Sequence, residues 1–120
     1  GVHASRIVLA GFSQGGAMAL HAGLRHAERL GGIMALSAYL LLADRLEREM
    51  NAANRLTPIF QAHGAQDPIV PLKLAEYSRD RIAAVRPGPD WHAYPMPHSI
   101  CGPEINDVRA WLLGTVGIGE

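Results

Sequence analysis

Gly11-Phe12-Ser13-Gln14-Gly15-Gly16 is the stretch that decides the fold, because the residues on either side of it indicate a turn between a strand and a helix. Residues 6–10 before it form an apolar run that is typical of a parallel strand covered on both faces. Residues 14–26 after it carry apolar side chains at helical spacing, which predicts an amphipathic helix. We therefore expect a sharp strand-to-helix turn with Ser13 at its tip.

The residue types in this turn suit a nucleophilic serine. In a Gly-x-Ser-x-Gly turn the serine is held in a strained backbone conformation that exposes its hydroxyl. Side chains at Gly11 and Gly15 are expected to collide with neighbouring strand or helix backbone. Gln14 would begin the helix, where its free N–H and the helix dipole can stabilise an oxyanion. The alternative is an ordinary glycine-rich turn that packs a helix on a sheet.

Length and composition exclude several classes of protein. The chain has 120 residues, which suffices for one modest core. Its 11 Lys and Arg residues balance 11 Asp and Glu residues without a basic stripe, so nucleic acid is not expected as a partner. The longest apolar stretch, residues 33–43, is too short to span a bilayer. A single cysteine excludes an internal disulfide framework and fits the reducing cytoplasm, where we expect the protein.

Apolar runs and helical patterns alternate along the rest of the chain. The expected strands are residues 6–10, 33–36, 57–64 and 91–94, and the expected helices are residues 14–26, 43–55, 71–86 and 103–113. Residues 37–42 are expected to form an apolar loop, and residues 114–120 a loose tail. Strands that alternate with helices predict an α/β fold with a parallel sheet of about four strands.

Ser13, Asp67 and His98 share a position, because each follows one of the expected strands. Sheets of this class carry their chemistry in loops at the carboxyl ends of the strands, so these side chains are candidates for one site. His63 is the rival base, but its place in a His-Gly-x-x-Asp turn suits bracing of that loop better. Cys101 has no sharp turn of its own and is expected to be a small packed residue rather than a nucleophile.

Three motifs carry a family resemblance. They are Gly-Phe-Ser-Gln-Gly-Gly at 11–16, His-Gly-Ala-Gln-Asp with Ile-Val-Pro at 63–71, and Pro-His-Ser-Ile-Cys at 97–101. In these motifs and their order the chain resembles the α/β-hydrolases, and in detail the carboxylesterase and acyl-protein thioesterase branch called the phospholipase/carboxylesterase family. The match spans nearly the whole chain.

The resemblance implies a role for each of these residues. Ser13 would attack an acyl carbonyl, His98 would take its proton and return it to the leaving group, and Asp67 would orient the His98 ring. The backbone N–H of Gln14 would supply one oxyanion donor, and no metal or organic cofactor would be needed. The residues near strand ends that could line an acyl pocket are Phe12, Leu40, Ile69 and Val70. The remaining histidines, His3, His21, His26 and His92, are expected on the surface or in satisfied core positions, with no zinc-like spacing to Cys101.

The resemblance also implies a substrate class. We expect a serine carboxylesterase that hydrolyses short to medium acyl esters of small molecules. The alternatives are an acyl-protein thioesterase or a lysophospholipase, and a non-catalytic fragment or interaction module that retains the hydrolase fold.

Members of this family have further strands upstream, including the loop that supplies a second oxyanion N–H. Residues 1–120 are therefore expected to form a single partial domain, the C-terminal half of a three-layer α/β-hydrolase sandwich. The strand at 6–10 would then be an apolar sheet edge, which is a template for pairing. We expect either an N-terminal segment of a longer protein or a second copy in a homodimer to cover this edge.

Overall fold

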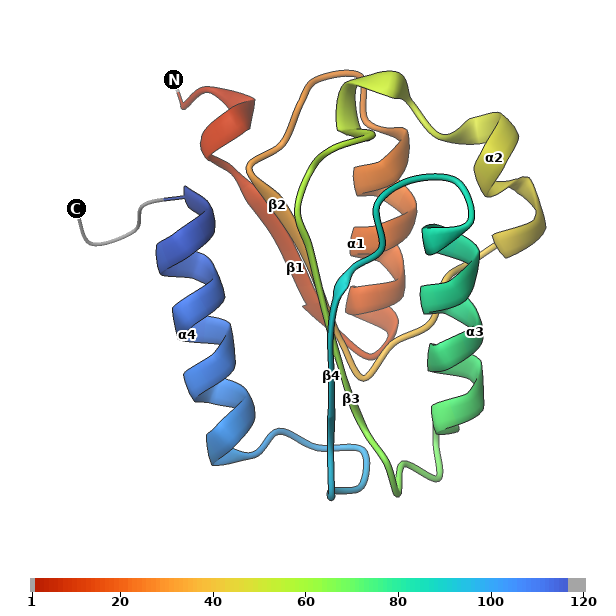
Figure 1. Ribbon diagram of the computed structural model, residues 1–120, viewed down its shortest axis with the longest axis vertical. Helices are drawn as coiled ribbons and strands as arrows, with labels where there is room; N and C mark the ends of the chain where they lie inside the picture. Colours follow the sequence, from red (N-terminus) through yellow and green to blue (C-terminus); the bar gives the residue numbers. More distant parts are fainter. Residues whose placement is uncertain (1, 117–120) are drawn as a thin grey trace.

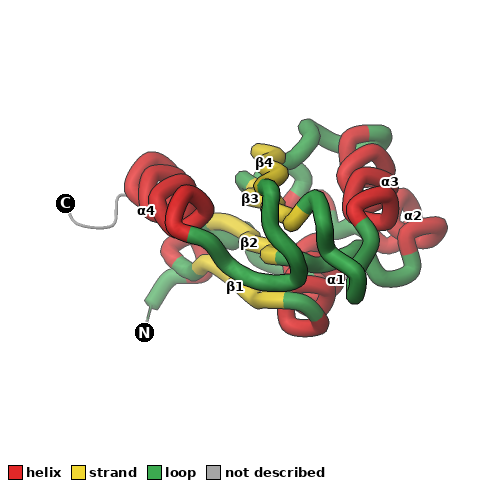
Figure 2. Tube along the Cα trace, turned by 90° about the horizontal axis from the view of Figure 1, so that it is seen from below, coloured by secondary structure: helices red, strands yellow, loops and turns green. Residues whose placement is uncertain are grey.

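The computed structural model describes residues 2–116 and shows one parallel sheet between two layers of helices (Figure 1). The elements in chain order are η1 (Ala4–Arg6), β1 (Val8–Phe12), α1 (Gln14–Arg25), β2 (Gly32–Leu36), η2 (Ala43–Arg45), α2 (Leu46–Glu49), η3 (Ala52–Asn54), β3 (Ile59–Gly64), α3 (Leu72–Ala83), β4 (Asp90–Tyr94) and α4 (Gly102–Val116), where η marks a 3₁₀ turn. Helices α1 and α3 cover one face of the sheet, and α4 lies on the other (Figure 2). The predicted α/β fold with four parallel strands is confirmed.

The four strands lie side by side in chain order, β1-β2-β3-β4. Val8 pairs with Gly32, Ile33 with Ile59, and Phe60 with Asp90, all in parallel register. Because every strand runs in the same direction, the loops that follow the strands emerge at one edge of the sheet. This carboxyl edge receives the candidate site residues.

Alternate side chains of the central strands enter two different cores. Ile33 packs with Leu24 on the α1 side, whereas the next residue, Met34, packs with Phe60 and Trp111 on the α4 side. Ile33, Leu24 and Phe60 are fully buried. The alternation follows from the two-residue period of a strand, and a strand covered on both faces reads as an unbroken apolar run.

Strand β1 forms an edge of the sheet, since within residues 2–116 it pairs only with β2. The prediction that this strand is covered on both faces is wrong for the described residues, because Ala10 and Phe12 are exposed and Val8 is half-buried. The reason is that the main contacts of α4 with the sheet are with β3. The bounds also differ, since Arg6 belongs to a 3₁₀ turn and the strand continues to Phe12.

The predicted helix at 43–55 is wrong in extent, because α2 is a single helical turn with one 3₁₀ turn before it and one after it. Met50 and Asn51 are extended, with ψ of 130° and 134°, and this ends the helix. The Asn51 N–H donates to the Leu24 carbonyl at 2.8 Å, and the Asn51 side chain accepts from the Ala53 N–H at 2.9 Å. Contacts with α1 therefore override the local helical spacing.

Buried Asn54 explains why the chain turns inward at this point. Its Oδ1 accepts from the Leu30 N–H at 2.8 Å and from the Thr57 hydroxyl at 2.7 Å. Its Nδ2 donates to the carbonyls of His26 at 3.0 Å and Glu28 at 2.8 Å. One side chain thus satisfies four polar groups of the loops at the amino edge of the sheet, which a continuous helix would leave unpaired.

The last helix is longer than predicted. Residues 114–116 continue α4, whereas the sequence predicts a loose tail from residue 114. The remainder of the predicted tail, residues 117–120, lies outside the described residues. No helix within residues 2–116 is long and apolar enough to cross a membrane.

Candidate active site

Ser13 lies between β1 and α1 in a backbone conformation that is unusual for a residue with a side chain, with φ 58° and ψ −120°. A positive φ of this kind stores strain that the surrounding structure must offset. The Ser13 N–H donates to the Leu36 carbonyl of β2 at 2.8 Å, and the Ser13 carbonyl accepts from the Ala17 N–H of α1 at 3.0 Å. Strand and helix therefore hold the turn from both sides.

At two positions of this turn, Gly11 and Gly16, neighbouring atoms lie too close to leave room for a Cβ atom. A Cβ on Gly11 would lie 2.2 Å from the Gly15 carbonyl carbon, and one on Gly16 would lie 2.7 Å from the Ala38 Cβ and 2.8 Å from the Gly11 oxygen. A Cβ on Gly15 would meet nothing within 4 Å in the described part of the chain. The predicted collision at Gly15 is therefore wrong, because Gly15 faces outward from the first turn of α1 and Gly16 faces the sheet.

Asp67 lies in the turn that follows β3, and its side chain has no exposed surface. Its Oδ1 accepts from the backbone N–H groups of Ile69 and Val70, each at 2.8 Å, and its Oδ2 accepts from His98 Nδ1 at 2.6 Å. Burial acts to raise the pKa of this carboxyl, but the hydrogen bonds from Val70, His98 and Ile69 outweigh burial and hold the pKa below its ordinary value. Asp67 is therefore an anion at neutral pH.

The loop that carries His98 passes directly over the end of β3. A Cβ on Gly64 would lie 2.3 Å from the Pro97 oxygen and 2.4 Å from the Met96 oxygen, so only glycine admits this crossing. The Ala65 N–H donates to the Tyr94 carbonyl at 2.8 Å, and the Gln66 N–H donates to the Met96 carbonyl at 3.1 Å. These bonds fasten the loop after β4 to the loop after β3 and so bring His98 beside Asp67.

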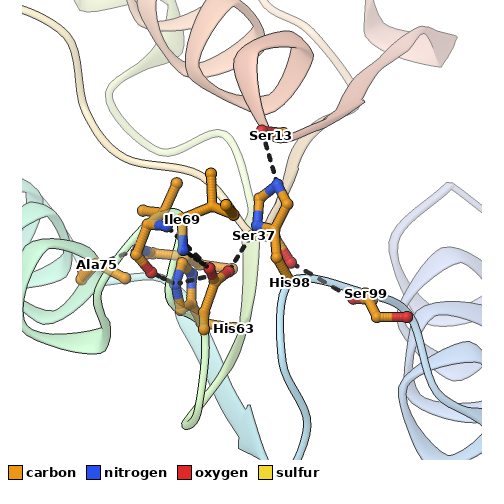
Figure 3. Close-up of polar contacts among 10 residues, drawn as sticks. Ser13, Ser37, His63, Ile69, Ala75, His98 and Ser99 are labelled. Atoms are coloured by element: carbon orange, nitrogen blue, oxygen red, sulfur yellow. Dashed lines mark hydrogen bonds and ion pairs between the residues drawn. The ribbon is translucent and has the colours of Figure 1, made fainter.

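The structure brings Ser13, His98 and Asp67 into one line of hydrogen bonds (Figure 3). His98 Nδ1 lies 2.6 Å from Asp67 Oδ2, and His98 Nε2 lies 2.9 Å from Ser13 Oγ. Because the ionised carboxylate only accepts, the proton of a neutral His98 ring is on Nδ1. The Nε2 lone pair is then free to accept from the Ser13 hydroxyl, which is the arrangement that a general base requires.

The other residues predicted for the site differ in accessibility. The Phe12 ring packs against the His98 ring with centroids 4.9 Å apart, and Phe12 is 37% exposed. Ile69 is 67% exposed, whereas Leu40 and Val70 are each only 5% exposed. Gln14 is exposed at the first position of α1, where backbone N–H groups have no partner within the helix.

His63, the rival base, lies away from the Ser13 hydroxyl and inside the protein. Its ring is fully buried, and its Nε2 lies 2.7 Å from the Val70 carbonyl and 3.6 Å from Asp67 Oδ2.

Among the remaining histidines, His92 lies between Asp90 and Asp107 at the far edge of the sheet. Cys101 is half-buried and packs against the α4-side core. No group of three or more His, Cys, Asp or Glu residues that could hold a metal ion occurs within residues 2–116.

Two buried polar residues, one after β2 and one at the start of α4, were not predicted from the sequence. Ser37 follows β2, is fully buried with φ 53°, and donates through its hydroxyl to the Ser99 carbonyl at 3.5 Å. Its position after a strand is the same signal that indicated Ser13 and Asp67. Glu104, in the first turn of α4, is also fully buried. Burial raises the pKa of Glu104, and the Cys101 backbone N–H offsets this only partly.

Comparisons with known proteins agree with this architecture. A family model described as phospholipase/carboxylesterase matches residues 1–115. Acyl-protein thioesterase 1 of Gibberella zeae is 43% identical over 115 residues, which cover 93% of this chain and 49% of that protein. Acyl-protein thioesterase 1 of Neurospora crassa is also 43% identical, with 47% of its length covered. The chain thus spans about half the length of the curated relatives it matches.

Solved structures share the same fold. SOBER1 of Arabidopsis thaliana superposes with a TM-score of 0.91 over 97% of this chain and 56% of its own, at 24% identity, a level that shows the fold alone. A phospholipase/carboxylesterase from Dyadobacter fermentans superposes with a TM-score of 0.78 over 94% of this chain and 55% of its own, at 32% identity.

Proposed function

The chain belongs to the phospholipase/carboxylesterase family, and from this membership we propose that it is a serine hydrolase of carboxylic esters whose triad is Ser13, His98 and Asp67. The observation that carries the proposal is the 2.9 Å approach of His98 Nε2 to Ser13 Oγ, with His98 Nδ1 anchored on Asp67 at 2.6 Å. A glycine-rich turn that merely packed a helix on a sheet would not need a base at this distance from the serine.

The first half-reaction joins the acyl group to the enzyme. As Ser13 Oγ bonds to the acyl carbon, its proton moves to His98 Nε2, and the buried Asp67 anion stabilises the imidazolium that forms. The Gln14 N–H, at the positive end of the α1 dipole, is our candidate donor to the oxyanion. When the bond from the acyl carbon to the leaving oxygen or sulfur breaks, His98 gives its proton to the leaving group.

The second half-reaction releases the acid. His98 removes a proton from a water molecule, the water oxygen attacks the acyl carbon, and the bond to Ser13 Oγ breaks as that oxygen regains its proton. The products are a carboxylic acid and an alcohol or thiol. Every proton transfer uses His98 Nε2, so no metal or organic cofactor enters the proposal.

Our proposed substrates are short to medium acyl esters of small molecules. We assign contact with the acyl chain to Phe12 and Ile69, which have exposed apolar surface, and the wall behind them to Leu40 and Val70. Thioesters of acylated proteins are the second candidate, because relatives that are 43% identical are named acyl-protein thioesterase 1. Lysophospholipids remain the third, and a chain-length series of esters, thioesters and lysophospholipids distinguishes the three classes.

Active-site labelling with a fluorophosphonate tests the proposal on the purified chain. The reagent bonds covalently to an activated serine, so labelling counts assembled sites even where turnover is slow. We expect one label on the peptide that contains Ser13, with none in Ser13→Ala and little in His98→Ala. A folded wild-type chain that takes up no label would refute the proposal and favour a non-catalytic module that retains the hydrolase fold.

We also propose that further polypeptide covers the free edge of β1, either a segment outside this chain or a second copy of it. The basis is that within residues 2–116 the strand from Val8 to Phe12 pairs on one side only, and that it exposes apolar side chains such as Phe12 at 37% exposure. The mass of the chain in solution tests this, and a monodisperse monomer would contradict the second copy.

The lone free thiol, Cys101, supports our proposal of a reducing, cytoplasmic location.

A further inference from the structure

His63 occupies a position that the proposed mechanism does not use. It is the next-to-last residue of β3, it has no exposed surface, and its Nε2 lies 3.6 Å from Asp67 Oδ2. Burying an imidazole costs free energy unless hydrogen bonds replace its lost hydration, so the contacts of the ring are informative.

The contacts show which nitrogen of the His63 ring carries a proton. Nε2 lies 2.7 Å from the Val70 carbonyl oxygen, which can only accept, so Nε2 must carry a proton and donate. The other ring nitrogen, Nδ1, is buried and has no hydrogen-bond partner among residues 2–116. An acceptor lone pair is less costly to bury than a second N–H with a positive charge, so the unpartnered Nδ1 favours the neutral Nε2–H tautomer.

Val70 connects His63 to the proposed triad. The Val70 carbonyl accepts from His63, while the Val70 N–H donates to Asp67 Oδ1 at 2.8 Å. The same peptide segment is thus held on both sides, and its position determines where Oδ1 of Asp67 can lie. With Oδ1 fixed by two N–H groups, the carboxylate plane directs Oδ2 toward His98 Nδ1 at 2.6 Å.

We propose that His63 is a positioning residue of the hydrolase site, which fixes the Val70 peptide through its Nε2–H and thereby aims the Asp67 carboxylate at His98. This inference rests on the proposed function. It differs from simple bracing because it requires a donor at Nε2 and a neutral ring. An imidazolium whose Nε2 lies 3.6 Å from Asp67 Oδ2 would compete with His98 for the same anion, and only the neutral ring avoids this competition.

Two substitutions separate the donor from the volume of the ring. His63→Leu keeps an apolar group of similar size and removes the donor, whereas His63→Gln places an amide N–H near the position of Nε2. His21→Leu is the matched control, because it makes the same chemical change on α1, away from the Asp67 turn. Unfolding in urea gives the stability of each variant, so loss of fold is distinguished from loss of geometry.

The kinetic readout is the rate of fluorophosphonate labelling per folded molecule, measured from pH 5 to pH 9. In His63→Leu we expect a fall of about 10-fold to 100-fold, the range that a misplacement of up to about 1 Å produces. We also expect the acid limb of the profile to move to lower pH, because a displaced Asp67 supports a protonated His98 less well. His63→Gln should recover most of the rate, and His21→Leu should match the wild type.

A spectroscopic readout does not depend on activity. Long-range ¹H–¹⁵N correlation of the imidazole rings in the wild-type chain should show His63 as the neutral Nε2–H tautomer. The His98 Nδ1 proton should resonate far downfield in the wild type and His63→Gln, and move upfield in His63→Leu. If His63→Leu does not fold, the wild-type tautomer and the labelling rate of His63→Gln relative to the wild type still decide the question.

Three results would overturn the inference. They are an Nδ1–H or charged His63, a folded His63→Leu with wild-type labelling and an unmoved acid limb, and a His63→Gln as slow as His63→Leu. Failure of the proposed function gives a different pattern, since the wild type would then take up no label while the His63 and His98 spectra could still show the expected tautomers.

Discussion

The substitution Gly11→Ala tests whether the strand-to-helix turn depends on backbone contact, as its geometry indicates. A Cβ at this position would lie 2.2 Å from the Gly15 carbonyl carbon, 2.3 Å from the Gly15 oxygen and 2.5 Å from the Gly16 nitrogen. All three are backbone atoms, so no side chain can rotate to make room. The first turn of α1 must move away from β1 as a unit.

The size of the effect follows from these distances. Carbon atoms in ordinary contact are about 3.5 Å apart, so the gap must open by about 1.3 Å. Overpacking of a core costs about 1–3 kcal/mol when side chains can adjust, and we expect at least about 3 kcal/mol here because they cannot. The shift also carries Ser13 away from His98, and a misplacement of about 1 Å lowers rates by about 100-fold.

Gly15→Ala is the matched control within the same turn. It adds the same methyl group where nothing lies within 4 Å in the described part of the chain. Alanine is favoured over glycine inside a helix by about 1 kcal/mol, so this variant should be more stable than the wild type by up to that amount. The two substitutions should therefore have opposite signs.

Urea unfolding followed by circular dichroism measures the free energy of unfolding, and mass spectrometry measures the rate of fluorophosphonate labelling. Gly11→Ala should lose both stability and labelling. A Gly11→Ala variant whose stability is within about 0.5 kcal/mol of the wild type and which labels at the wild-type rate would refute the steric argument. Equal destabilisation by Gly15→Ala would refute the assignment of the required contact to Gly11.

Three further predictions concern buried polar groups. The raised pKa of Glu104 means that the wild type loses stability as pH rises above the ordinary carboxyl pKa. Glu104→Gln should therefore be more stable than the wild type in urea unfolding at pH 7, and the difference should shrink toward pH 4. A difference of the same size at pH 4 would contradict this cause. Asn54→Ala should lower the free energy of unfolding by about 3 kcal/mol, because it leaves buried N–H and carbonyl groups unpaired, while the labelling rate per folded molecule stays unchanged. Asp67→Asn should fold but label about 10⁴-fold more slowly, because the amide N–H₂ facing His98 forces the ring proton onto Nε2; wild-type labelling would show that Asp67 does not set the tautomer.

Local sequence sufficed for the fold class and for the kind of turn at Ser13. Strand periodicity and helical spacing are properties of short segments, and the strands and most helices lie within a few residues of their predicted positions. The exception at 43–55 has a physical cause, since buried Asn54 gains four hydrogen bonds by leaving the helix, and three of its four partners are distant in sequence.

The sequence by itself determined which residues follow the strands, and parallel strands bring those residues to one edge whatever the details of packing. What it could not decide depends on contacts between segments that meet only in the folded chain. Gly16 rather than Gly15 is the second sterically required glycine because the helix faces Ala38 there. The distances from His98 to Ser13 and Asp67 also depend on such contacts, because the loop after β4 crosses Gly64 and is fastened to the end of β3. Periodicity describes one segment at a time, whereas these choices follow from the distances between two.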